Sequence, residues 1–143
     1  MTASDELKAY IDTIEESYEF FLAYAAQGIS GEQASKSSGQ VREFLQRTEA
    51  ALPVLAELFS KTVQERDAAG PGRYEKFIEV LERDAQDSLA AIQLVLAQPS
   101  ISSQMIDNLN ALIHLRSLLT DVFLVDEMLS PRAAGGSIPL AEG

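Results

Sequence analysis

The chain contains no cysteine and no tryptophan, and its single histidine is His114. Without thiols it can form no disulfide, thiolate zinc site or iron–sulfur cluster, and it has no cysteine nucleophile. It lacks the roughly 18 consecutive apolar residues that a membrane-spanning helix needs. Residues 1–6 are polar and acidic, unlike a secretory signal peptide. We therefore expect a cytoplasmic protein with no cofactor.

Basic residues are scarce, because 11 Lys and Arg stand against 22 Asp and Glu, which gives a net charge of −11. Phosphate backbones and anionic lipids bind proteins through Lys and Arg, so we predict neither nucleic acid nor a membrane as a partner. The negative charge either keeps the protein soluble or steers it toward a basic partner. With 143 residues, 46% of them hydrophobic, the chain suits one globular domain.

Apolar residues recur at three- and four-residue spacing in four segments, as in amphipathic helices. The segments cover approximately residues 4–27, 30–63, 72–97 and 102–129. Gly28, a Gly-Pro-Gly turn at 70–72 and Pro99 separate them, and no strand-like alternation is present. Short connections make consecutive helices antiparallel. The prediction is an all-α, antiparallel up-down four-helix bundle over residues 1–130, followed by a flexible tail at 131–143.

Pro53 lies inside the second segment, where its missing N–H and its ring disturb a helix. Helical phase places it opposite Leu52 and Leu55, on the solvent side. Two interpretations stay open: one helix that bends around the core, or a new helix with Pro53 in its first turn.

The fourth segment has two apolar seams, displaced by roughly 100° on a helical projection. The first consists of Met105, Leu109, Leu112, Leu119 and Phe123. The second consists of Leu115, Leu118, Val122, Val125 and Leu129. An ordinary bundle helix needs a narrower apolar arc, so this helix is either central in the monomer or contacts another chain. We predict that the second seam binds a partner, which is a second copy in a homodimer or another protein.

Arg116 lies within the first seam, and Asn108 lies between the two seams. A guanidinium in apolar surroundings needs a carboxylate or carbonyl partner. One interpretation is a structural ion pair with Asp84, Asp126 or an acidic residue of another subunit. The alternative is a pocket for a small molecule or anion, with the candidate residues Arg116, Asn108, Tyr10 and Tyr24.

No catalytic or metal-binding motif is present. Di-iron bundles need a Glu-x-x-His motif on each of two helices, whereas Ala111 precedes His114 by three residues. His114 shares a polar stripe with Asp107, Asn110, Ser117 and Asp121. This stripe is interpreted as a solvated face, with a metal or acid–base role as the alternative. The sequence thus favours a non-enzymatic interaction protein of adaptor, regulatory or chaperone type that self-associates through its fourth helix. The alternative is a bundle, with or without catalytic activity, that binds a small molecule or anion in a pocket near Arg116.

Overall fold

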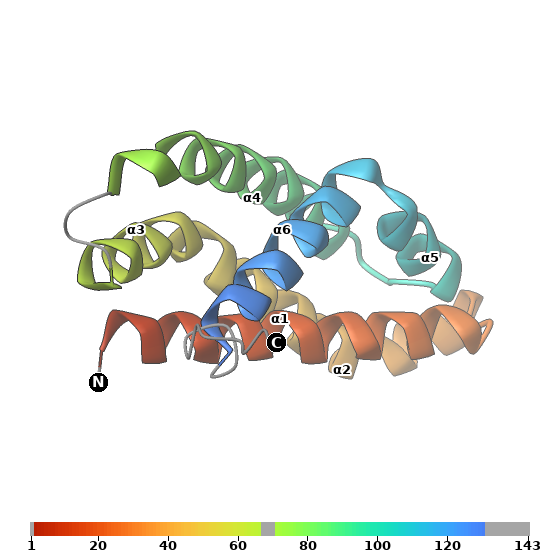
Figure 1. Ribbon diagram of the computed structural model, residues 1–143. Coiled ribbons are helices and arrows are strands. Elements are labelled where there is room, and N and C mark those ends of the chain that lie inside the picture. The colour runs from red at the N-terminus through yellow and green to blue at the C-terminus, as the bar shows by residue number, and fades with distance from the viewer. Residues whose placement is uncertain (1, 67–70, 131–143) are drawn as a thin grey trace, which may run out of the picture.

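The computed structural model describes residues 2–66 and 71–130, which are helical with short connections and contain no strand (Figure 1). The helices are α1 (Ala3–Ala26), α2 (Gly31–Ala51), the 3-10 turn η1 (Leu52–Val54), α3 (Leu55–Arg66), the 3-10 turn η2 (Pro71–Tyr74), α4 (Glu75–Leu96), α5 (Ser103–Ala111) and α6 (Ile113–Leu129). The predicted all-α class is confirmed. The predicted four helices are six α-helices in the described residues. The predicted tail at 131–143 lies outside them.

Helix α1 is the element on which most of the others pack. It contacts α2, α3, α5 and α6, while α4 contacts α3 and α6. In Figure 1, α1 and α4 lie on opposite sides of the molecule, and α6 crosses obliquely between them. The sequence starts α1 firmly, because Thr2 Oγ1 accepts the Asp5 amide at 3.0 Å and the Asp5 carboxylate accepts the Thr2 amide at 3.3 Å. This capping box satisfies two amides that the first helical turn leaves free.

Pro53 lies in a 3-10 turn between α2 and α3. Helix α2 ends at Ala51, residues 52–54 form a 3-10 turn, and α3 starts at Leu55. Pro53 is exposed, as its helical phase predicted. The missing N–H of proline costs nothing in a first helical turn, where that group has no partner within the helix. The backbone keeps right-handed helical dihedrals at Ala51, Leu52 and Leu55. The structure therefore combines features of both interpretations: the chain path stays helical, and Pro53 lies in the turn that leads into α3.

The predicted fourth helix is broken at Leu112, which is the main correction to the predicted fold. Leu112 has φ −62° and ψ 132°, an extended conformation between α5 and α6. Two apolar seams on one straight helix would face different directions. The break lets each half turn its own apolar side to the core, and α5 buries Ile106 and Leu109 while α6 buries the second seam.

A buried hydrogen-bond cluster joins the α1–α2 loop to the α4–α5 loop. The Tyr24 hydroxyl donates to the Ile101 carbonyl at 2.6 Å, and burial raises the pKa of that hydroxyl. The Ser103 hydroxyl donates to the Tyr24 carbonyl at 2.5 Å and accepts the Ile29 amide at 2.9 Å. The Ser103 amide in turn donates to the Ile29 carbonyl at 2.9 Å. These bonds satisfy loop backbone groups that are out of reach of water.

We expect Tyr24→Phe to lower the free energy of unfolding by about 1 kcal/mol, because it leaves the Ile101 carbonyl without its donor. The measurement is urea unfolding followed by circular dichroism. Tyr18→Phe is the matched control, since the Tyr18 hydroxyl has no hydrogen-bond partner within residues 2–66 and 71–130 and its loss should change stability little. Equal stability of the two variants would contradict a stabilising role for this cluster.

Candidate functional site

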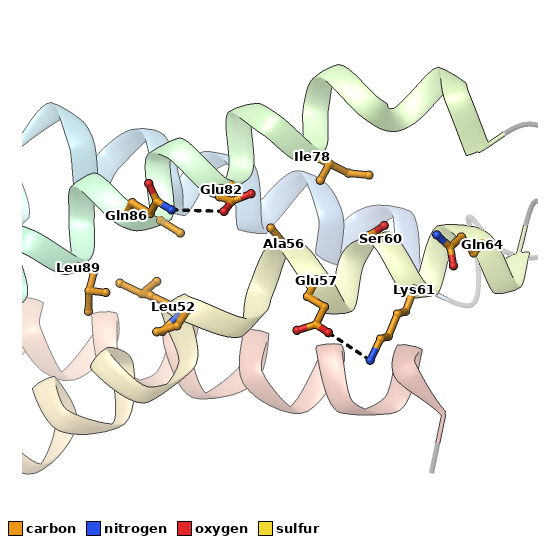
Figure 2. A pocket seen from close by; sticks show the side chains of 12 residues that line it. Leu52, Ala56, Glu57, Ser60, Lys61, Gln64, Ile78, Glu82, Gln86 and Leu89 are labelled. Carbon is orange, nitrogen blue, oxygen red and sulfur yellow. Dashed lines mark hydrogen bonds and ion pairs between the residues drawn. The ribbon is translucent and has the colours of Figure 1, made fainter.

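An open groove of about 630 Å³ lies between α3 and α4 (Figure 2). Its floor is apolar and contains Leu52, Ala56, Ile78, Ala85 and Leu89. Its rims are polar and contain Glu57, Ser60, Lys61, Gln64, Glu82 and Gln86. Each wall is about three helical turns long, because the lining runs from Leu52 in η1 to Gln64 on α3, and from Ile78 to Leu89 on α4.

Small side chains make the groove. Ala56 on α3 and Ala85 on α4 both line the groove, and both are buried, with relative exposures of 9% and 4%. A larger side chain at either position would fill the space between the helices. The inner faces of the same helices are occupied, since α3 packs on α1 and α4 packs on α6. The groove therefore lies on the outside of a completed core.

Carboxylates lie on both rims of the groove. On α3, Lys61 Nζ pairs with Glu57 Oε2 at 3.4 Å, and on α4 the Gln86 amide donates to Glu82 Oε2 at 3.3 Å (Figure 2). The Glu57 charge is thus balanced by a neighbour on its own helix. Glu82 has no cationic partner in the described part of the chain. The α4 rim consequently carries an unbalanced negative charge beside an apolar floor.

A second, shallower hollow of about 450 Å³ lies between α4 and α6 and contains a carboxyl pair. Burial and the adjacent Asp84 carboxyl raise the pKa of Asp121 to about 7. The Oδ2 atom of Asp121 is shielded from solvent and has no hydrogen-bond donor among the described residues. A proton shared by Asp84 and Asp121 would satisfy this oxygen, which explains the direction of the shift.

The other side of α6 carries a mixed charge cluster against α1. Lys8 Nζ lies 2.7 Å from Asp126 Oδ1 and 3.2 Å from Asp12 Oδ1. Burial, together with the hydrogen bond and charge of Asp126, raises the pKa of Glu15 to about 7. Burial also acts upward on the pKa of Asp126, but the hydrogen bonds from Lys8 and Glu15 outweigh it and lower that pKa. Helix α6 is therefore flanked on both sides by a carboxyl group whose pKa is raised to about 7.

The polar stripe through His114 forms no metal site within residues 2–66 and 71–130. His114 Nδ1 lies 3.8 Å from Asp87 Oδ2, and both side chains are about half exposed. No group of three or more His, Asp or Glu side chains in this part of the chain is placed to hold a metal ion. His114 is exposed, but the stripe as a whole is not a solvated face, because the Asn110 amide donates to the Phe21 carbonyl at 3.4 Å and Asp121 Oδ2 is shielded from solvent.

The four candidate ligand residues do not come together. Arg116 is exposed and lines the hollow between α4 and α6, whereas Asn108 lines a different hollow between α4 and α5. The Tyr24 hydroxyl donates to the Ile101 carbonyl in the buried loop cluster, and Tyr10 packs at the edge of the core. The expected ion pair of Arg116 with Asp84 or Asp126 is also absent from the described contacts, because Asp126 pairs with Lys8. The break at Leu112 turns Arg116 outward, away from the apolar surroundings that the sequence suggested.

The predicted partner-binding seam is buried in the chain's own core. Relative exposure is 3% for Leu115, 0% for Leu118, 1% for Val122, 3% for Val125 and 9% for Leu129. A second chain could reach these side chains only if α6 left the bundle, so they have no free surface in this fold. The large apolar side chains that α6 does expose are Ile113 at 69%, Phe123 at 47% and Leu124 at 61%.

Sequence reasoning missed the groove because its residues belong to ordinary helical faces. Ala56 and Ala85 are the one local signal, since an alanine in place of a leucine on an apolar stripe leaves room for a neighbour. The two alanines indicate a groove only once α3 and α4 are known to lie side by side. Searches for similar family models, curated proteins and solved structures gave no match. None of the described helices combines the length and apolarity that crossing a bilayer requires.

Proposed function

We propose that the chain is a non-enzymatic interaction protein whose groove between α3 and α4 receives an amphipathic helix of a partner protein. The observation that carries the proposal is the groove itself, which has an apolar floor, polar rims and no covering element among the described residues. Helix-in-groove binding uses this arrangement, because the apolar stripe of the incoming helix meets the floor and its polar sides stay at the rims.

The dimensions of the groove fit a helix. Both walls extend for about three turns, so an incoming helix of about 16 Å would present side chains at positions i, i+4, i+7 and i+11 to the floor. The small side chains of Ala56 and Ala85 would let its backbone approach closely. A compact ligand would contact only part of this length and would leave the rest of the apolar floor in water.

The charges favour a basic partner. Glu82 on the α4 rim is unbalanced, and the whole chain carries a net charge of −11. A Lys or Arg on the flank of the incoming helix would pair with Glu82, and the overall field would speed the encounter of oppositely charged proteins. This gives the acidic composition a role beyond solubility. A cytoplasmic location and the lack of nucleic-acid and membrane partners stay predictions from composition.

The alternative of an anion site at Arg116 receives less support. Arg116 shares its hollow with Asp84 and Asp121, and the negative charge of an Asp84–Asp121 pair repels an anion. The hollow is also shallow, so water would screen the attraction of a single guanidinium.

The proposal is tested with a helical peptide of about 18 residues built from Leu, Ala and Lys, and with a second peptide in which Glu replaces Lys. We expect the Lys peptide to bind the full chain in fluorescence anisotropy and the Glu peptide to bind at least about tenfold more weakly. Ser60→Trp fills the groove and should weaken binding of the Lys peptide at least about tenfold. Gln46→Trp, at an exposed position of α2 outside the groove, is the matched control and should leave binding unchanged.

Charge reversal separates the groove from the general field of the protein. Glu82→Lys should weaken binding of the Lys peptide about threefold to tenfold, because it removes the unbalanced rim charge. Glu16→Lys makes the same change in net charge at an exposed position of α1. Equal losses in the two variants, or unchanged binding in Ser60→Trp, would show that the peptide binds the acidic surface at large and would overturn the proposal.

A further inference from the structure

Helix α6 carries two seams of heptad spacing on opposite faces. Positions 115, 118, 122, 125 and 129 alternate steps of three and four residues and are buried. Positions 113, 116, 120, 123 and 127 repeat the same steps two residues earlier and are all exposed. Two residues correspond to about 200° of helical rotation, so the second set lies on the outside. We call the set Ile113, Arg116, Thr120, Phe123 and Glu127 the outer seam.

The outer seam combines apolar contact with unpaired charge. Ile113 and Phe123 are exposed at 69% and 47%, and Leu124 beside the seam is exposed at 61%. The Thr120 hydroxyl donates to the Arg116 carbonyl at 2.9 Å, so its polar atom is satisfied within the helix and its methyl group is free for apolar contact. Arg116 and Glu127 have no ion-pair partner in the part of the chain that the structure describes.

The seam is complementary to itself in one orientation. In an antiparallel pair of α6 helices, Arg116 of one copy can face Glu127 of the other, and the twofold axis then repeats this pair at the opposite end. The same register brings Phe123 of each copy over Thr120 of the other, between the two charge pairs. In a parallel pair Arg116 would meet Arg116 and Glu127 would meet Glu127, which is repulsive.

We propose that a second copy of this chain docks on the outer seam, so that two α6 helices pair antiparallel with reciprocal Arg116–Glu127 ion pairs. A twofold contact of this kind is isologous and closes at the dimer. A single helix on each side buries less than about 1,000 Å², so the dimer is weak, with a dissociation constant in the micromolar range. The outer seam is separate from the α3–α4 groove, and either proposal can fail without the other.

Charge-reversed variants test the register by analytical ultracentrifugation at about 0.15 M salt, up to several hundred micromolar protein. Wild type should dimerise. Arg116→Glu and Glu127→Arg should each weaken dimerisation at least about tenfold, since each places like charges in both end layers. The double variant, and an equimolar mixture of the two single variants, should recover dimers. A wild type that stays monomeric, or a double variant as weak as the single ones, would overturn the proposal.

Cysteine crosslinking gives an independent readout, because the natural chain has no cysteine that could react. Arg116→Cys mixed with Glu127→Cys should form a mixed disulfide in mild oxidant. Each variant alone should crosslink at least about fivefold more slowly, since in the antiparallel register its own cysteines lie about 16 Å apart along the helix axis. Fast crosslinking of Arg116→Cys with itself would indicate a parallel pair and would overturn the proposed register.

Discussion

Replacing Leu118 by alanine is expected to lower the free energy of unfolding by about 3 kcal/mol. Leu118 is completely buried in the middle of α6, where the inner side of this helix packs against α1 and α4. The substitution removes three carbons, one methine and two methyl groups, and leaves a cavity. A closely packed core relaxes into such a cavity only in part. Leu124→Ala makes the same chemical change on the outer side of the same helix, where 61% of the side chain is exposed.

The two variants are compared by urea unfolding at a protein concentration at which the chain is monomeric. Leu124→Ala should change the free energy of unfolding by less than about 0.5 kcal/mol. A stable Leu118→Ala variant that loses only self-association would mean that the second seam faces another chain, as the sequence first suggested. That result would contradict the monomer core described above.

The apolar period is sufficient to predict the helices but not the break at Leu112. Gly28 and Pro53 interrupt helices for reasons that are local, because glycine adopts a positive φ of 69° and proline lacks an N–H. Leu112 is a good helix former, and nothing in its own chemistry ends a helix. The sequence feature that indicates the break is the pair of displaced seams, because one straight helix could not bury both of them in the same core. The pattern alone predicts only a wide apolar surface, which a central position in the monomer or a partner chain would explain.

The candidate site depends on tertiary placement that no local pattern contains. Asp84 and Asp121 become a pair because α4 packs on α6, and Ala56 and Ala85 become one groove because α3 packs on α4. Arg116 illustrates the same limit. Its helical phase relative to residues before Leu112 placed it among apolar side chains, and the break then turned it to solvent. Phase arguments hold within a helix and fail across an unpredicted interruption.

Raising the pH from 5 to 8 is expected to destabilise the protein by about 2 kcal/mol, which corresponds to a fall in Tm of about 6 °C. Burial and a neighbouring carboxyl raise the pKa of Glu15 and of Asp121 to about 7, from ordinary values of 4.5 and 3.8. Between those values and pH 7 the folded state holds protons that the unfolded state has released. The stabilisation is complete below the ordinary pKa values and is lost as the pH rises through about 7.

The size of this effect is set by exposure to solvent. A rise in pKa from 4.5 or 3.8 to about 7 would correspond to more than about 3 kcal/mol for each carboxyl if that carboxyl were fully buried. Both side chains touch water, so we expect about 1 kcal/mol from each. Asp126 acts in the opposite sense. Its lowered pKa stabilises the folded state above the ordinary value of 3.8, and this stabilisation is lost only as the pH falls below that value. Stability should therefore be greatest near about pH 4, between the ordinary pKa values of these carboxyls, in a thermal scan at several pH values.

Asp121→Asn identifies the source of the pH dependence. An asparagine amide can donate to the Asp84 carboxylate at any pH, so this variant should raise Tm at pH 8 by about 3 °C, change it little at pH 5 and remove about half of the slope. Asp107→Asn is the matched control, since Asp107 is exposed on α5, outside both carboxyl clusters. An equal gain in the control would assign the effect to relief of the net charge of −11. A gain confined to Asp121→Asn would place it at the contact between α4 and α6, because there the two carboxyls compete for one proton.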